Sequence, residues 1–173
     1  MLATLQTYLS RLGQLRQNSQ ATDELSLRPA LDELFQNLKP AQVDFVGEGK
    51  QIAGGRPDFT FTRGVYNDPI GYVEAEKIAA DLGKLTGHAK IQNERFCADL
   101  DNFLLTNHLD FRLYDGGDLV ERATLPEKSA DLNARHETDF ARLWQRFTEA
   151  QIAAPQRGRK PASRHTDWRN PVA

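Results

Sequence analysis

The chain has little cysteine, no long hydrophobic run and no large excess of either charge. The single cysteine, Cys97, cannot form a disulfide within the chain or supply a cluster of thiolate ligands, which predicts a reducing compartment and a cytoplasmic protein. No apolar stretch approaches the roughly 20 residues that span a bilayer, and the N-terminus lacks the basic and apolar segments of a secretion signal. We therefore expect no membrane association.

A net charge of -2 argues against a protein that holds nucleic acid by bulk electrostatics alone. Any DNA affinity must come from local patches, metal ions or attached domains. The sequence also lacks a P-loop, a GxGxxG segment and a Ser-His-Asp arrangement. Its histidines have no paired spacing typical of zinc sites, so surface or structural roles are expected for His88, His108, His136 and His165.

With 173 residues, of which 39% are hydrophobic and 27% charged, the chain can form one well-buried core. Apolar side chains recur every three or four residues in three stretches, which predicts helices over residues 1–16, from near Pro29 to Pro40, and over 131–151. Pro29 should mark the start of the second helix and Pro40 its end. The third helix carries an apolar stripe that needs a partner surface, formed by Phe140, Leu143, Trp144 and Phe147.

Between these helices the apolar residues no longer follow the helical spacing. Short runs rich in Val, Ile, Phe and Tyr predict strands there. They cover residues 43–47, 57–62, 70–77, 102–107 and 109–115, with a possible further strand at 119–125. A helix is expected at 81–100, with Leu85, Ile91, Phe96 and Leu100 on one face. This order predicts an α/β fold with a mixed central β-sheet flanked by helices, extended by helices at both ends.

Two neighbouring strands carry the acidic residues of most interest. Side chains alternate across a strand, so Tyr72, Glu74 and Glu76 should project to one face and Lys77 to the other. Asp58 opens the preceding strand, and its carboxylate approaches Glu74 if the two strands pair. Like charges at close range are unfavourable unless a cation neutralises them, and oxygen ligands select Mg²⁺ or Mn²⁺.

This spacing resembles the PD-(D/E)xK nucleases, with Pro57 and Asp58 as the PD and Glu74, Ala75 and Glu76 at the (D/E)xK. The resemblance covers about residues 22–114 and implies a restriction-endonuclease-like core. It also implies Mg²⁺ or Mn²⁺ as cofactor, DNA as substrate, and an activated water that attacks a metal-polarised phosphate. The metal ligands it implies are Asp58, Glu74 and Glu76.

Supporting residues also follow from the resemblance. Glu24 matches an acidic residue on an early helix, and Gln92 with Phe96 matches a Gln and an aromatic residue that follow the catalytic strand. Lys90 and Arg95 flank Gln92 on the same predicted helix, where they could hold the DNA backbone.

The segment NFLLTNHLDFRLYDGG is similar to nuclease modules fused to DNA methyltransferases in restriction-modification enzymes, including single-polypeptide Type I-like and Type IIG-like ones. The expected organisation is a nuclease domain over residues 1–125, a helical extension over 126–153 and a linker or disordered tail over 154–173. Attached methyltransferase, motor or target-recognition domains are expected in a longer polypeptide. Target choice would lie there, because no base-reading motif is evident.

One position departs from the family pattern, which usually has Lys where this sequence has Glu76. Some restriction endonucleases use ExE, with the second Glu assisting metal binding or water activation. Lys77 could replace the missing lysine only if a bulge turns it to the other face. Alternatively, the site is attenuated and the domain is a DNA-binding or interaction module that keeps the nuclease fold. A more remote alternative is a small structural domain.

Overall fold

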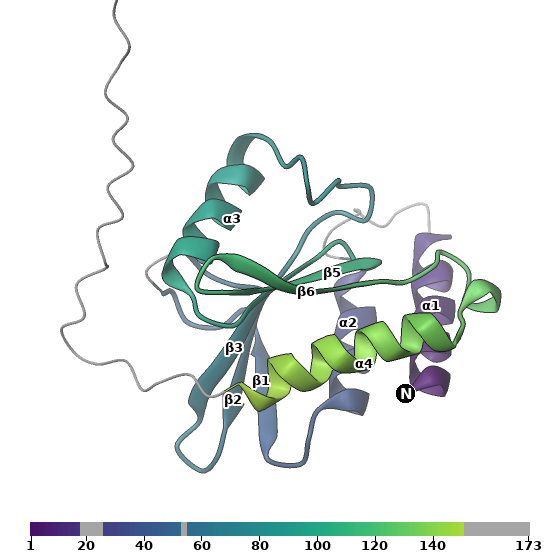
Figure 1. Ribbon diagram of the computed structural model, residues 1–173, viewed down its shortest axis with the longest axis horizontal. Coiled ribbons are helices and arrows are strands. Elements are labelled where there is room, and N and C mark those ends of the chain that lie inside the picture. Colours follow the sequence, from purple (N-terminus) through teal and green to yellow (C-terminus); the bar gives the residue numbers. More distant parts are fainter. Residues whose placement is uncertain (18–25, 53–54, 151–173) are drawn as a thin grey trace, which may run out of the picture.

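The computed structural model describes residues 1–17, 26–52 and 55–150, which form an α/β fold with six strands and four α-helices (Figure 1). The elements, in chain order, are α1 (Leu2–Arg16), α2 (Arg28–Leu38), β1 (Val43–Gly47), β2 (Phe59–Arg63), β3 (Asp68–Ala75), α3 (Gly87–Asp99), β4 (Phe103–Thr106), β5 (Asp110–Asp115), β6 (Asp118–Thr124), the 3-10 turn η1 (Ser129–Asp131) and α4 (Ala134–Glu149).

All six strands belong to one sheet in the order β1-β2-β3-β4-β5-β6. Neighbouring strands are antiparallel except β3 and β4, which are parallel. A parallel pair needs a crossover connection, and here it contains α3. The mixed sheet expected from the sequence is therefore confirmed, and the possible extra strand exists as β6.

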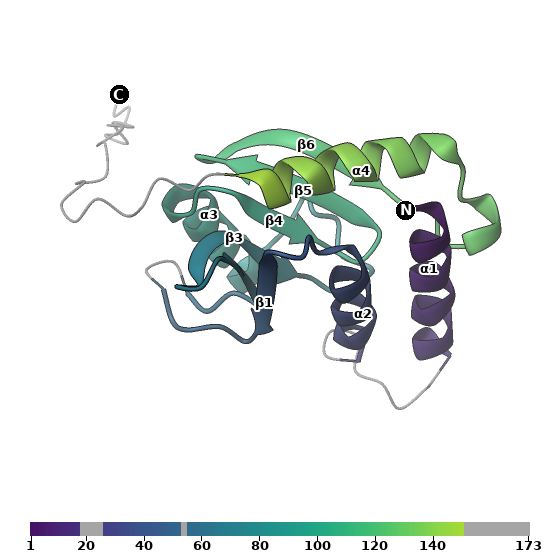
Figure 2. The same ribbon diagram turned by 90° about the horizontal axis from the view of Figure 1, so that it is seen from below.

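Helices cover the two faces of the sheet unequally. In Figures 1 and 2, α1, α2 and α4 lie on one face and α3 lies on the other. The larger hydrophobic core includes buried side chains of α1, α2 and α4 together with Phe61, Val73 and Phe111 of the sheet. A smaller core forms around Phe96 of α3 and Phe103 of β4. Both faces are thus held by apolar burial, the dominant favourable term in folding.

The three amphipathic helices form where the periodicity predicts them. Pro29 occupies the first turn of α2, where its missing N–H removes no helical hydrogen bond. The α4 stripe finds its partner surface on the sheet and on α2, because Trp144 stacks on Phe35 at 5.4 Å between ring centroids. The Trp144 Nε1 also donates a hydrogen bond of 3.0 Å to the carbonyl of Leu38. The predicted helical extension therefore packs into the main core.

The helix expected at 81–100 is shorter than predicted. Helix α3 runs from Gly87 to Asp99, so Leu85 precedes it and Leu100 is its C-cap. Ile91, predicted on the apolar face, is 50% exposed. Phe96 is the one side chain of α3 that is fully buried. Gly87 adopts a φ of 58°, a left-handed conformation that suits glycine and separates the helix from the turns before it.

Two segments predicted from the sequence fall outside the described residues. Glu24 lies in one of them, and the linker over residues 154–173 lies in the other. Within the part of the chain that the structure describes, no helix has the length and apolarity required to cross a membrane.

Candidate active site

The sheet register brings Asp58 and Glu74 together. Phe59 of β2 is opposite Val73 of β3, so in an antiparallel pair the residue before Phe59 faces the residue after Val73. The backbone N–H of Asp58 donates to Glu74 Oε2 at 3.3 Å, and the N–H of Ala75 donates to Asp58 Oδ2 at 2.9 Å. The two carboxylates, both buried, therefore lie side by side where β2 begins and β3 ends, as the sequence predicts.

Helix α3 adds Gln92 to this pair. Its side-chain amide donates a hydrogen bond of 2.7 Å to Glu74 Oε1. The helix is anchored one turn later by the fully buried Phe96, whose ring would lie 3.2 Å from a Cβ atom on Gly55. Because Phe96 holds α3 against the sheet, Gln92 is positioned to orient the Glu74 carboxylate.

Glu74 has a strongly perturbed pKa. The pKa of its carboxyl is raised from 4.5 to about 8, chiefly by burial and then by the charges of Asp58 and Glu76, while a hydrogen bond from the Asp58 backbone and the charge of Arg28 act in the lowering direction. Burial penalises the ionised form because the carboxylate loses water, and neighbouring carboxylates repel the same charge. Glu74 is therefore mostly protonated at neutral pH unless a cation compensates for these effects.

An arginine that the sequence analysis did not single out contacts the site from the opposite helical layer. Arg28, the first residue of α2, forms a hydrogen-bonded ion pair between its Nη2 and Asp58 Oδ1. Its Nη1 lies 3.6 Å from Glu48 Oε1, just beyond β1. No local motif marks this residue, because the contact depends on where the α2 N-terminus meets the sheet. The site therefore lies at the sheet edge between α2 and α3.

Glu76 lies just beyond β3, so strand alternation no longer decides where its side chain points. Its backbone N–H still donates to the carbonyl of Thr106 at 2.7 Å, and its side chain is half-buried. Its charge raises the pKa of Glu74, which places it near the carboxylate pair. Lys77, the candidate replacement for the missing lysine, is exposed.

The predicted DNA-binding residues lie on the same helix as Gln92, toward solvent. Lys90 Nζ is 3.7 Å from Glu94 Oε1 in an exposed ion pair, and Arg95 is exposed. Such exposed pairs contribute little to stability. The side chains of Lys90 and Arg95 therefore remain available to a ligand. Their role in DNA binding stays a prediction.

Asp58 and Glu74 fit a magnesium site in which water and substrate supply the remaining ligands. Among residues 1–17, 26–52 and 55–150, no group of three or more His, Cys, Asp or Glu side chains is arranged to hold a metal ion. Mg²⁺, however, commonly binds through one or two carboxylates, with waters and substrate phosphates completing its shell. The hard oxygens of Asp58 and Glu74 meet that requirement, and the raised pKa of Glu74 marks a place where a cation would relieve repulsion between the carboxylates.

Comparison with known proteins shows the fold. No protein-family profile matches the sequence, and no curated protein matches it. Among the solved structures that match, the cryo-electron microscopy structure of a DrdV–DNA complex superposes with a TM-score of 0.68 at 20% sequence identity. The match covers 88% of this chain and 14% of the DrdV chain. The chain thus spans about one seventh of that protein, and the likeness confirms the expected α/β, restriction-endonuclease-like architecture.

Proposed function

We propose that this chain is a metal-dependent endonuclease domain that hydrolyses DNA phosphodiester bonds as part of a restriction-modification system. The observation that carries the proposal is the buried Asp58–Glu74 pair, held at the ends of adjacent strands with Gln92 on Glu74. Two adjacent buried carboxylates are costly to desolvate, and perturbed titratable groups of this kind cluster at functional sites.

Each residue has a role in this proposal. Asp58 and Glu74 would hold Mg²⁺ or Mn²⁺, and Glu76 would serve as a further ligand or would activate water. When bound, the cation supplies Lewis-acid polarisation of the phosphate and a lower pKa for the attacking water. Gln92 holds the Glu74 carboxylate in place through its 2.7 Å hydrogen bond. Lys90 and Arg95 would contact the DNA backbone beside the site.

The proposed substrate and the proposed attached domains rest on the shared fold. DrdV is described in complex with DNA, and this chain matches 14% of its length. We infer that DNA is the substrate, and that methyltransferase, motor or target-recognition domains of a longer polypeptide choose where to cut. Glu24, predicted to support the site, lies outside the described residues and keeps that role as a proposal.

Nicking of supercoiled plasmid tests the proposal. The wild-type chain at micromolar concentration should nick plasmid with Mn²⁺ and not with EDTA, while Glu74→Gln should lose this activity. Glu94→Gln is the matched control, because Glu94 is an exposed acidic residue of α3 that forms an ion pair with Lys90 and lies outside the Asp58–Glu74 pair. Equal nicking by wild type and Glu74→Gln would contradict the assignment of the site.

One observation favours a second candidate, a nuclease-fold module that binds DNA or a partner without cutting. Glu76 stands where the related pattern usually has lysine, and the exposed Lys77 does not take its place in the strand. Metal binding without nicking, also after attachment to the neighbouring domains, would support this alternative. Metal binding and cleavage together would exclude it.

A further inference from the structure

We propose that the pocket formed by the β1–β2 loop binds a phosphate of the DNA backbone beside the scissile one. The inference rests on the proposed function, since it assumes that DNA lies across the Asp58–Glu74 site. It adds a substrate contact on a part of the chain that carries none of the predicted site residues.

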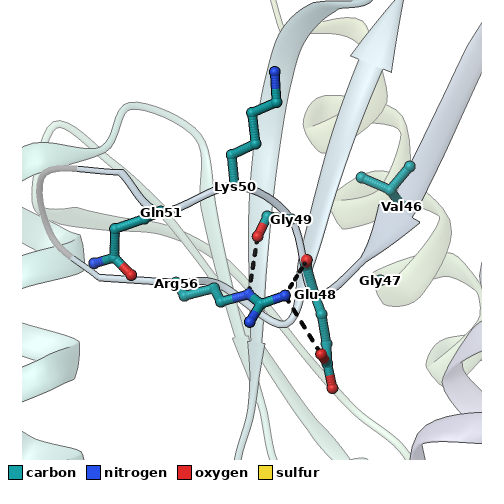
Figure 3. A pocket seen from close by; sticks show the side chains of 7 residues that line it. All are labelled: Val46, Gly47, Glu48, Gly49, Lys50, Gln51 and Arg56. Carbon is teal, nitrogen blue, oxygen red and sulfur yellow. Dashed lines mark hydrogen bonds and ion pairs between the residues drawn. The ribbon is translucent and has the colours of Figure 1, made fainter.

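The pocket lies along the end of β1 and the loop that follows it (Figure 3). It has a volume of about 490 Å³ and is lined by residues 46–51 together with Arg56. Val46 forms an apolar wall and is 56% exposed. Two of the lining residues are glycines, so part of the wall is bare backbone. Such an open hollow, with charged side chains and bare backbone in its wall, suits a solvated anionic group better than an apolar ligand, which needs a more enclosed site.

The loop is held in a defined shape by Arg56. The Arg56 Nε donates to the carbonyl of Gly49 at 3.0 Å, and Nη2 donates to the carbonyl of Glu48 at 3.0 Å. Gly49 packs so closely on Thr60 that a Cβ atom there would clash with its hydroxyl. The pocket is therefore preorganised, which reduces the entropy lost when a ligand binds.

The charges around the pocket favour an anion. The Glu48 carboxylate lies between two arginines, at 3.6 Å from Arg28 Nη1 and 3.5 Å from Arg56 Nη2, so its charge is largely compensated. Among the ion pairs and hydrogen bonds of the described residues, none involves the ammonium of Lys50, which extends away from the loop in Figure 3. An ammonium of this kind is a typical point-charge ligand for phosphate.

The pocket is also close enough to the site to share one DNA strand with it. The N–H of Glu48 donates to the carbonyl of Asp58 at 2.7 Å, so the pocket wall and the proposed metal ligand are neighbours across adjacent strands. Each DNA strand carries one phosphate per roughly 3.4 Å along the helix axis. A strand whose scissile phosphate lies at Asp58 would therefore carry its neighbouring phosphates past the loop that holds Lys50.

Salt-dependent binding of a short DNA duplex tests the proposal. Fluorescence anisotropy is measured with wild type, Lys50→Gln, Lys50→Arg and the control Lys128→Gln, in Ca²⁺ and at a series of low salt concentrations. Lys50→Gln should weaken binding several-fold and lower the slope of log affinity against log salt by roughly one, the signature of one lost phosphate contact. Lys50→Arg should restore both values. Lys128→Gln makes the same charge change at the N-cap of η1, an element that contributes no residue to the pocket, and should alter neither.

Separate measurements distinguish this proposal from the proposed function. Lys50→Gln should keep the rise in melting temperature that Mn²⁺ produces, since within the described part of the chain Lys50 forms no ion pair or hydrogen bond with a carboxylate of the site. Equal affinities and salt slopes for Lys50→Gln and Lys128→Gln would overturn the phosphate subsite and leave the metal site intact. Failure of wild type to bind duplex even at low salt would also overturn it. A slope change specific to Lys50 without any nicking would support the subsite and contradict the cleavage assignment.

Discussion

Arg28 and Asp58 form an ion pair that links the start of α2 to the start of β2. Asp58 is 7% exposed, so this guanidinium is a main source of compensation for its buried charge. The same carboxylate is a proposed metal ligand. Arg28 and a bound cation would therefore both compensate the charge of the Asp58 carboxylate. Mutation of Arg28 separates the two contributions.

Arg28→Gln should destabilise the metal-free chain and increase its response to metal. Removing one partner of a buried ion pair typically costs about 3–5 kcal/mol, because it leaves an uncompensated charge. Mn²⁺ should recover part of this loss, since the cation then neutralises Asp58. Urea unfolding with and without Mn²⁺ measures both effects, with Arg11→Gln as control for an exposed pair at 3.4 Å from Glu33. A variant as stable as wild type without metal would show that Asp58 does not depend on Arg28.

Mg²⁺ or Mn²⁺ should raise the melting temperature of the wild-type chain. A cation that binds the folded site and not the unfolded chain shifts the unfolding equilibrium by mass action, by about 2.7 kcal/mol at a hundred times its dissociation constant. Asp58→Ala removes a ligand and should abolish the rise. If millimolar Mn²⁺ leaves the melting temperature of wild type unchanged, the proposed metal site is wrong.

The stability of the metal-free chain should fall as pH rises through the range where Glu74 ionises. Its folded pKa of about 8 exceeds the ordinary 4.5, so the folded state binds more protons than the unfolded state between these values, and the favourable contribution is lost toward pH 8. Between pH 7 and 8 the expected loss is about 1 kcal/mol per pH unit. Urea unfolding in EDTA measures it.

Two controls identify Glu74 as the source of that slope. Glu74→Gln should flatten it, and saturating Mn²⁺ should reduce it, because the metal favours the ionised carboxylate. The buried His108, whose pKa is lowered to about 4, contributes in the opposite sense, since its stabilisation is lost as pH falls from 6.5 toward 4. An unchanged slope in Glu74→Gln between pH 7 and 8 would assign the effect to another group.

DNA binding by the 173-residue chain alone should be weak and without sequence preference. The net charge of -2 is unfavourable for a polyanion, and the contacts proposed at Lys50, Lys90 and Arg95 would reach phosphates, which carry no direct sequence information. Competition between duplexes of different sequence at physiological salt measures this. Tight binding to one sequence would contradict the assignment of target choice to other domains.

The carboxylate pair could be predicted because it follows from strand rules alone. Alternation and antiparallel pairing bring Asp58 opposite Glu74 whatever the rest of the chain does. Arg28 could not be predicted in the same way, because its contact depends on how α2 packs on the sheet. The error at Ile91 has a similar origin: Phe96 is the one fully buried side chain of α3, so the spacing of apolar residues was a poor guide to the face that the helix buries.

The pocket residues also depend on tertiary structure. Nothing in the segment VGEGKQ indicates that Glu48 would lie between Arg28 and Arg56, or that the loop would lie beside Asp58. The contact between Glu48 and Arg28 joins this loop to α2, and sequence periodicity carries no information on such a pair. The sequence thus predicted the sheet and its acidic residues, while the surrounding cations required the packed structure.

Glu76 allows the sharpest test of the proposed chemistry. If it is a metal ligand, Glu76→Gln keeps the shape and removes the charge, and it should weaken Mn²⁺ binding and nicking together. The pKa of Glu74 should fall as well, because the charge of Glu76 contributes to raising it. A flatter dependence of stability on pH in Glu76→Gln would report this second effect independently of activity.

Glu76→Lys then distinguishes a working site from an attenuated one. It supplies the lysine that the PD-(D/E)xK pattern usually has there and places a cation where it could stabilise charge at the phosphate, but it cannot bind the metal that Glu76 would hold. A working ExE site should therefore lose activity or change its metal preference. An attenuated site should instead gain cleavage, because the missing lysine is supplied. Nicking assays with Mg²⁺ and Mn²⁺ on wild type and both variants, in the chain and in any longer polypeptide that contains it, decide the question. Strong activation by Glu76→Lys of an otherwise silent protein would show that Glu76 is not a functional ligand and that the natural chain is a non-cutting module.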